Sequence, residues 1–133
     1  ISKLTKLESL DFCLDQKSLK DETLKVLGDS IKCCPSLRTL KMICNFEDEM
    51  KCLQNLFTGL KNLETLVIEI QTLRSDQSLW YFSEGIKELK SLRILQCKVS
   101  YGHFTKEGFK YLEDALMELL YLVRLDLNLY LIY

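Results

Sequence analysis

A phrase of eleven residues with regularly spaced apolar positions recurs five times in this chain, and it constrains the fold more than any other feature. In outline the phrase is Leu-x-x-Leu-x-x-Leu-x-apolar-x-apolar. Its copies start at Leu4, Cys34, Leu60, Leu89 and Leu119, which are 30, 26, 29 and 30 residues apart. Self-similarity at intervals of this size indicates a repeat architecture. We therefore predict five repeats, in preference to an ordinary α/β domain whose strands are similar by coincidence.

Each phrase combines two spacings. Its last three apolar positions alternate with other residues, which is typical of a strand with one buried face. Its leading Leu-x-x-Leu spacing predicts the turn that leads from a helix into that strand. The five strands are expected near residues 8–14, 38–44, 64–70, 93–99 and 123–129.

Between the phrases, apolar residues recur at intervals of three and four, which predicts a helix with one apolar stripe. Leu24, Leu27 and Ile31 form the first such stripe, and similar stripes precede the third, fourth and fifth phrases. Ser75 and Thr105 stand at the expected starts of two later helices, where their side chains would cap the first turn. The sequence therefore predicts strands and helices in strict alternation.

This combination of repeat length and leucine-rich phrase resembles the long-repeat, ribonuclease-inhibitor-like class of leucine-rich-repeat proteins. The resemblance covers essentially the whole chain, and it implies one leucine-rich-repeat domain over residues 1–133. The implied fold is an α/β solenoid of about five repeats, with parallel strands on the concave face and helices on the convex face. Because terminal repeats need a polar outer face and neither end has one, we expect this solenoid to be part of a longer one.

The family places Asn or Cys where each strand bends away, and this chain departs from that rule. The equivalent positions hold Asp15, Asn45, Gln71, Ser100 and Tyr130, of which only Asn45 matches. We therefore expect a less regular ladder of side chains between repeats. The persistent third apolar position of each phrase also predicts longer strands.

The uncovered concave face is the first candidate binding surface, because alternate strand residues point toward it. If like positions stack in register, Glu69 lies beside Lys98 and Asp11 lies beside Lys41. These charges have two interpretations: they fix the register between repeats, or they form a docking surface of mixed charge. The candidate partner-binding residues are Asp11, Lys41, Ile43, Val67, Glu69, Ile94, Gln96, Lys98, Arg124, Asp126 and Asn128.

Aromatic residues form a second candidate surface. Trp80 and Tyr81 are expected on the third helix, outside its apolar stripe, and Tyr101 and His103 in the loop after the fourth strand. Packing within the core or between helices is one interpretation. Contact with a neighbouring subunit is the other.

Composition argues against several classes of function. The net charge is -1, from 18 basic and 19 acidic residues, so nothing attracts a phosphate backbone over a distance. The apolar segment at the end of the chain alternates like a strand, which argues against membrane insertion. The six cysteines include no C-x-x-C pair and the chain has one histidine, so no zinc site or other cofactor is expected. Thiols in a reducing, cytoplasmic compartment are the preferred interpretation, and a disulfide framework is the alternative.

No nucleophile motif or glycine-rich phosphate loop surrounds His103, so we do not expect an enzyme. The sequence favours a non-catalytic scaffold or adaptor that binds a protein through the concave face. One alternative is a regulatory subunit of an enzyme, such as a substrate receptor of a ubiquitin ligase or a GTPase activator. The other is a structural component of a large assembly.

Overall fold

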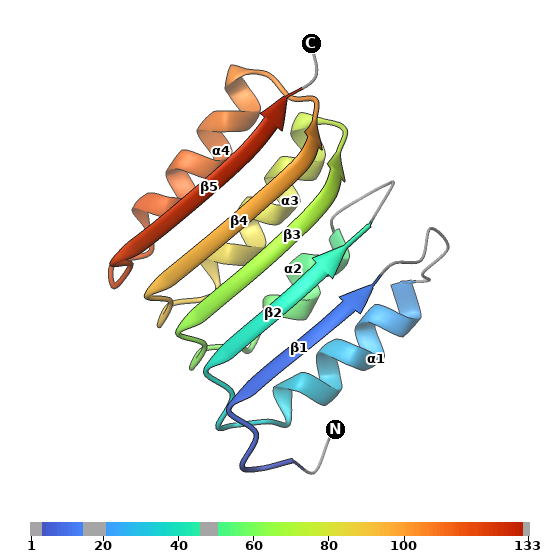
Figure 1. Cartoon of the computed structure of the whole chain (residues 1–133), viewed down its shortest axis with the longest axis vertical. Helices are drawn as coiled ribbons and strands as arrows, with labels where there is room; N and C mark the ends of the chain where they lie inside the picture. Colours follow the sequence, from blue (N-terminus) through green and yellow to red (C-terminus); the bar gives the residue numbers. More distant parts are fainter. Residues whose placement is uncertain (1–3, 15–20, 46–50, 132–133) are drawn as a thin grey trace.

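The computed structural model describes residues 4–14, 21–45 and 51–131, in which strands and helices alternate without exception (Figure 1). The strands lie in one layer and the helices in a second layer. In chain order the elements are β1 (Ser9–Leu14), α1 (Asp21–Lys32), β2 (Thr39–Cys44), α2 (Lys51–Phe57), β3 (Thr65–Leu73), α3 (Asp76–Lys87), β4 (Ile94–Gly102), α4 (Lys106–Met117) and β5 (Arg124–Leu131).

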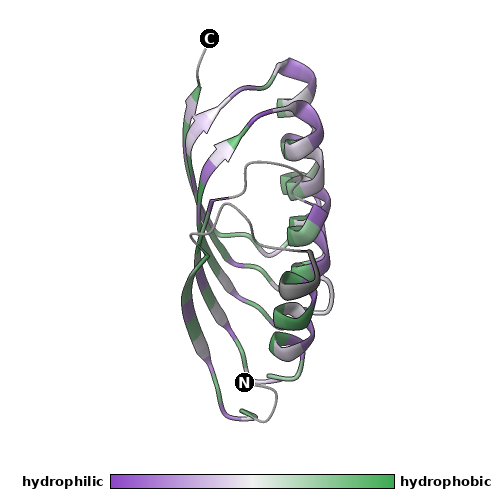
Figure 2. Ribbon diagram, turned by 90° about the vertical axis from the view of Figure 1, so that its right-hand side faces the viewer, coloured by the Kyte–Doolittle hydropathy of each residue, from purple (hydrophilic) through white to green (hydrophobic). Residues whose placement is uncertain are grey.

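All the described strands are parallel, and each pairs with the next strand along the chain, in the order β1-β2-β3-β4-β5. Parallel neighbours need a crossover connection, which the helices supply. Figure 2 shows that the helices lie on one side of the sheet. The expected parallel α/β architecture is therefore confirmed. Each expected strand begins within one residue of the observed one.

The Leu-x-x-Leu spacing has a direct backbone explanation. In every copy of the phrase, the amide of the fourth residue donates to the carbonyl of the first, with N···O distances of 3.1 to 3.3 Å. The amide of the following residue then bonds to the previous repeat, as Arg38 does to Glu8 and Val123 does to Arg93. Each turn is thus fixed to its neighbour before the strand begins, which sets the register of the sheet.

The core lies between the sheet and the helices and is deepest in the middle of the stack. Leu40, Leu66 and Leu95 occupy the same position of the phrase, and each is 0% exposed. The equivalent Leu125 on β5 is 42% exposed, and Leu10 on β1 is half-buried. At this position of the phrase, a leucine is therefore fully buried only where its strand has a neighbouring strand on both sides.

Side chains at the helix ends agree with the predicted caps. The Ser75 hydroxyl accepts from the amide of Ser78 at 3.2 Å, and the Thr105 hydroxyl accepts from the amide of Glu107 at 3.2 Å. Asp76, in the first turn of α3, also accepts from the backbone amide of Thr105 at 2.7 Å and from its hydroxyl. This carboxylate ties the starts of α3 and α4 together across 29 residues of sequence.

The strands β3, β4 and β5 run beyond the expected ranges, as the persistent apolar positions predicted. Gln71 and Ser100 therefore lie inside strands rather than at a bend, and Asp15 lies outside the described residues. The pairing of β4 with β5 shifts register between Val99 and Gly102. In the part of the chain that is described, no helix is both long and apolar enough to cross a membrane.

Candidate functional site

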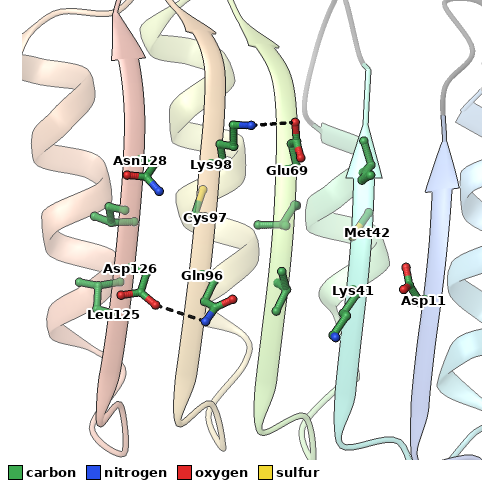
Figure 3. Close-up of a pocket in the computed structure, with 14 residues that line it drawn as sticks. Asp11, Lys41, Met42, Glu69, Gln96, Cys97, Lys98, Leu125, Asp126 and Asn128 are labelled. Atoms are coloured by element: carbon green, nitrogen blue, oxygen red, sulfur yellow. Dashed lines mark hydrogen bonds and ion pairs between the residues drawn. The ribbon is translucent and has the colours of Figure 1, made fainter.

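The face of the sheet opposite the helices, here called the open face, carries a shallow hollow of about 710 Å³ (Figure 3). Side chains from every described strand line it, and no described helix covers it (Figure 2). Most of the residues predicted for partner binding lie in this lining: Asp11, Lys41, Ile43, Val67, Glu69, Gln96, Lys98, Asp126 and Asn128. Ile94 and Arg124 lie two residues earlier on their strands, outside the lining.

The strand register arranges these side chains in rows across the sheet. One row contains Asp11, Lys41, Val67, Gln96 and Asp126. The next row contains Cys13, Ile43, Glu69, Lys98 and Asn128. Like positions of successive repeats are therefore neighbours, as the sequence predicted.

The predicted contact between β3 and β4 is confirmed, because Lys98 Nζ lies 3.4 Å from Glu69 Oε1. A cross-strand pair of this kind stabilises by about 0.2–1 kcal/mol. Asp11 also lies beside Lys41, as predicted. Asp11 and Lys41 are register partners, yet no ion pair joins them, and in Figure 3 their side chains lean in opposite directions. Both are exposed, so water competes well for each charge.

A second polar group lies at the β5 side of the hollow. Asp126 Oδ2 accepts from Gln96 Nε2 at 3.2 Å and from Arg124 Nε at 3.0 Å. The acidic side chain at this end of the open face is therefore already bound by neighbours of the same chain. Together with Glu69 and Lys98, this arrangement leaves little unbalanced charge for a highly charged ligand.

Two of the six cysteines lie directly beneath the open face. Burial raises the pKa of the Cys97 thiol to about 12, and burial also raises that of Cys44, with Cys13 and Cys97 as lesser causes. These thiols are protonated at neutral pH, so they are poor nucleophiles and poor metal ligands. None of the six cysteines is in a disulfide bond. The described residues contain no cluster of His, Cys, Asp and Glu arranged to hold a metal ion.

The aromatic residues predicted as a second surface come from two parts of the fold. Trp80 and Tyr81 lie on α3, as expected, half-buried and in edge contact with ring centroids 5.1 Å apart. Tyr81 packs against the core, which favours the packing interpretation. Tyr101 is not in a loop, because pairing with Thr72 keeps it inside β4, where its side chain is exposed. His103 follows β4, and its amide bonds to the carbonyl of Leu73.

Sequence reasoning missed an apolar surface at the end of the stack, here called the fifth-repeat patch. It consists of Met117, Leu120, Tyr121 and Val123, which are between 68 and 84% exposed. A signal was present in the sequence. The position of Val123 is charged in every earlier phrase, and the position of Tyr121 is polar in every earlier phrase.

The chain was compared with protein-family models, with curated proteins and with solved structures, and no significant match was found.

Proposed function

We propose that this chain is a non-catalytic protein-interaction module of the leucine-rich-repeat type, which binds a protein partner through its open face. The observation that carries the proposal is the hollow lined by side chains of every described strand. A sheet whose helices all lie on one side leaves its other face available to a partner. A row of parallel strands about 4.8 Å apart suits a segment of protein better than a small metabolite.

The chemistry of the open face supports a binding role. Its charged residues are mostly paired with one another, and the thiols beneath it are protonated. Catalysis by a nucleophile or a general base would need a group that is poised to react. The net charge of -1 favours a protein over nucleic acid or an anionic membrane. The exposed thiols Cys13 and Cys33 favour a reducing compartment such as the cytoplasm.

Reversing one ion pair on the open face tests the proposal. In the double variant Glu69→Lys with Lys98→Glu, the two charges exchange strands, so we expect the fold to be retained and the binding of partners to change. The matched control is Glu84→Lys with Lys87→Glu, which reverses an ion pair of 2.7 Å on α3, in the helix layer.

Binding is measured by quantitative affinity purification, followed by the affinity of each recovered partner for the purified variants. The proposal requires that the open-face variant loses or weakens partners that the α3 variant retains. Unchanged affinity of the open-face variant, in a chain that remains folded, would exclude this face from the interaction.

A structural role in a large assembly is the second candidate, and the fifth-repeat patch favours it. Leu120, Tyr121 and Val123 line one hollow together, and exposed apolar patches of this kind mark protein contacts. This candidate requires contacts at the end of the stack in addition to the open face. Substituting Leu120 and Tyr121 by polar residues should then release the protein from its assembly, whereas the open-face reversal should not.

A further inference from the structure

A second hollow, of about 300 Å³, lies in the helix layer rather than on the open face. Asp76, Gln77 and Trp80 of α3 line it together with Tyr111 of α4. The two helices pack against each other and are neighbours in the layer (Figure 1). Sites for small ligands measure about 300 to 1,000 Å³, so this hollow has room for one small group.

The aromatic side chains of this hollow are not used by the core. Trp80 is the chain's one tryptophan, and it is half-buried. Tyr81 beside it packs against the core, but Trp80 is not among the side chains that do so. Tyr111 is 40% exposed. Aromatic rings carry partial negative charge on their faces, so two of them at one hollow favour a cation.

Two carboxylates add full negative charge at the same end of α3 and α4. Asp76 and Glu107 both bond to the Thr105 hydroxyl, which lies 2.7 Å from Glu107 Oε2. A hydroxyl has one proton, so it donates to only one of them at a time. The Thr105 hydrogen bond lowers the pKa of Glu107, whereas the charge of Asp76 acts to raise it. No ion pair between described residues includes either carboxylate, so a bound cation would be their first basic partner.

The position of Asp76 narrows the kind of cation. A Cβ on Gly108 would collide with this carboxylate, so the glycine allows it to lie against the α4 backbone. Asp76 Oδ1 accepts from the Thr105 amide at 2.7 Å, and Oδ2 contacts the Thr105 hydroxyl. Because both oxygens already have partners, the carboxylate offers a ligand its charge more than its hydrogen bonds. This favours a cation that donates no hydrogen bond.

We propose that the hollow between α3 and α4 binds a trimethylammonium group, with its methyl groups against Trp80 and Tyr111 and its charge beside Asp76. A quaternary ammonium has no N–H to satisfy, and aromatic side chains recognise it through cation–π attraction. A primary ammonium would instead need acceptors in place of the water that it loses. The site is separate from the open face, so the inference goes beyond the proposed function and does not depend on it.

Fluorescence titration of the whole chain with choline tests the inference, because Trp80 alone supplies the tryptophan signal. We expect a saturable change with choline. The neutral analogue, in which carbon replaces the nitrogen, should bind at least about tenfold more weakly because it lacks the charge. Sodium chloride at the same ionic strength corrects for screening. A peptide with trimethyllysine forms a second arm: tighter binding than choline assigns the group to a protein, and equal or weaker binding assigns it to a free small molecule.

Tyr111→Leu removes one aromatic ring and keeps the Trp80 signal. Because Tyr111 is exposed, the fold should be retained, and choline should bind about fivefold more weakly. Tyr121→Leu, which removes an exposed tyrosine elsewhere, is the matched control and should leave the affinity unchanged. Asp76→Asn should also weaken binding. Glu107→Gln removes a neighbouring charge and provides a second reading if the Asp76 variant does not fold.

Three results would overturn the inference. The first is a fluorescence change that does not saturate with choline. The second is equal binding of choline and its neutral analogue, which would show that the carboxylates and the ring faces do not select a charge. The third is an affinity for choline that Tyr111→Leu leaves unchanged. None of these results bears on the open face, which the reversal of Glu69 and Lys98 tests separately.

Discussion

Leu95 and Leu125 occupy the same position of successive phrases, but their burial differs, and this difference predicts unequal costs of truncation. Leu95 is 0% exposed and Leu125 is 42% exposed. Replacing leucine by alanine removes about three carbons, or about 2.4 kcal/mol of transfer free energy when the side chain is fully buried. In a closed core a cavity adds to this, so Leu95→Ala should lower the free energy of unfolding by about 3–5 kcal/mol.

For Leu125→Ala the same transfer term scales with the buried fraction, to about 1.4 kcal/mol. The cavity term is small, because solvent reaches the space that the side chain leaves. Leu66→Ala, at the same position of the third phrase and also 0% exposed, should behave like Leu95→Ala. Urea denaturation followed by circular dichroism measures all three costs on one chain.

Equal costs at Leu95 and Leu125 would refute this reasoning, because they would show that both residues have neighbours on both sides. A larger cost at Leu125 would refute it more strongly. A fall in the denaturant slope of the Leu95 variant is expected if the stack begins to unfold in parts, since each repeat contacts only its neighbours.

Three further predictions concern single features. A Cβ on Gly108 would collide with the Asp76 carboxylate, so Gly108→Ala should destabilise the wild type. The same substitution should be neutral or stabilising when Asp76→Ala is also present, and a double-mutant cycle by thermal denaturation measures this difference. The Thr105 hydroxyl lowers the pKa of Glu107, so Glu107→Gln should reduce stability at neutral pH and lose its effect as pH falls below the folded pKa; an equal effect at all pH values would contradict this. Leu120→Lys together with Tyr121→Ser should leave the melting temperature unchanged, because both side chains are mostly exposed, and a large loss of stability would mean that these residues belong to the core.

The pH prediction for Glu107 follows from the direction of its shift. A carboxylate with a lowered folded pKa contributes stability above its unfolded pKa, and that contribution disappears as pH falls through the folded pKa. The neutral amide in the Glu107→Gln variant cannot titrate, so the difference between the two proteins should vanish in acid. Unfolding curves at several pH values measure this directly.

The sequence predicted the layers and the register because both depend on periodic features. Alternation around Leu66 and Leu95 identifies the buried face of a strand, and the turn after Leu60 or Leu89 is local in sequence. Like positions then become neighbours with no further information. The Glu69–Lys98 ion pair follows from this register alone.

The features that were not predicted depend on side-chain direction or on position within the stack. The phrase places Leu125 and Leu95 in identical surroundings, whereas the structure leaves Leu125 at an edge. Asp11 and Lys41 are register partners, but register fixes the positions of Cα atoms and not the direction of flexible side chains. The bond between Asp76 and Thr105 joins two helix starts, which a pattern of apolar residues does not describe.

The measurement that tests the account most directly is site-specific photo-cross-linking in the native protein within its own cells. Benzoylphenylalanine replaces Gln96, which lines the hollow of the open face, or Lys110, which is exposed on α4 in the helix layer. We predict a covalent adduct with a partner protein from position 96, identified by mass spectrometry, and none from position 110. Adducts from position 110 alone would contradict the claim that the open face is the binding surface.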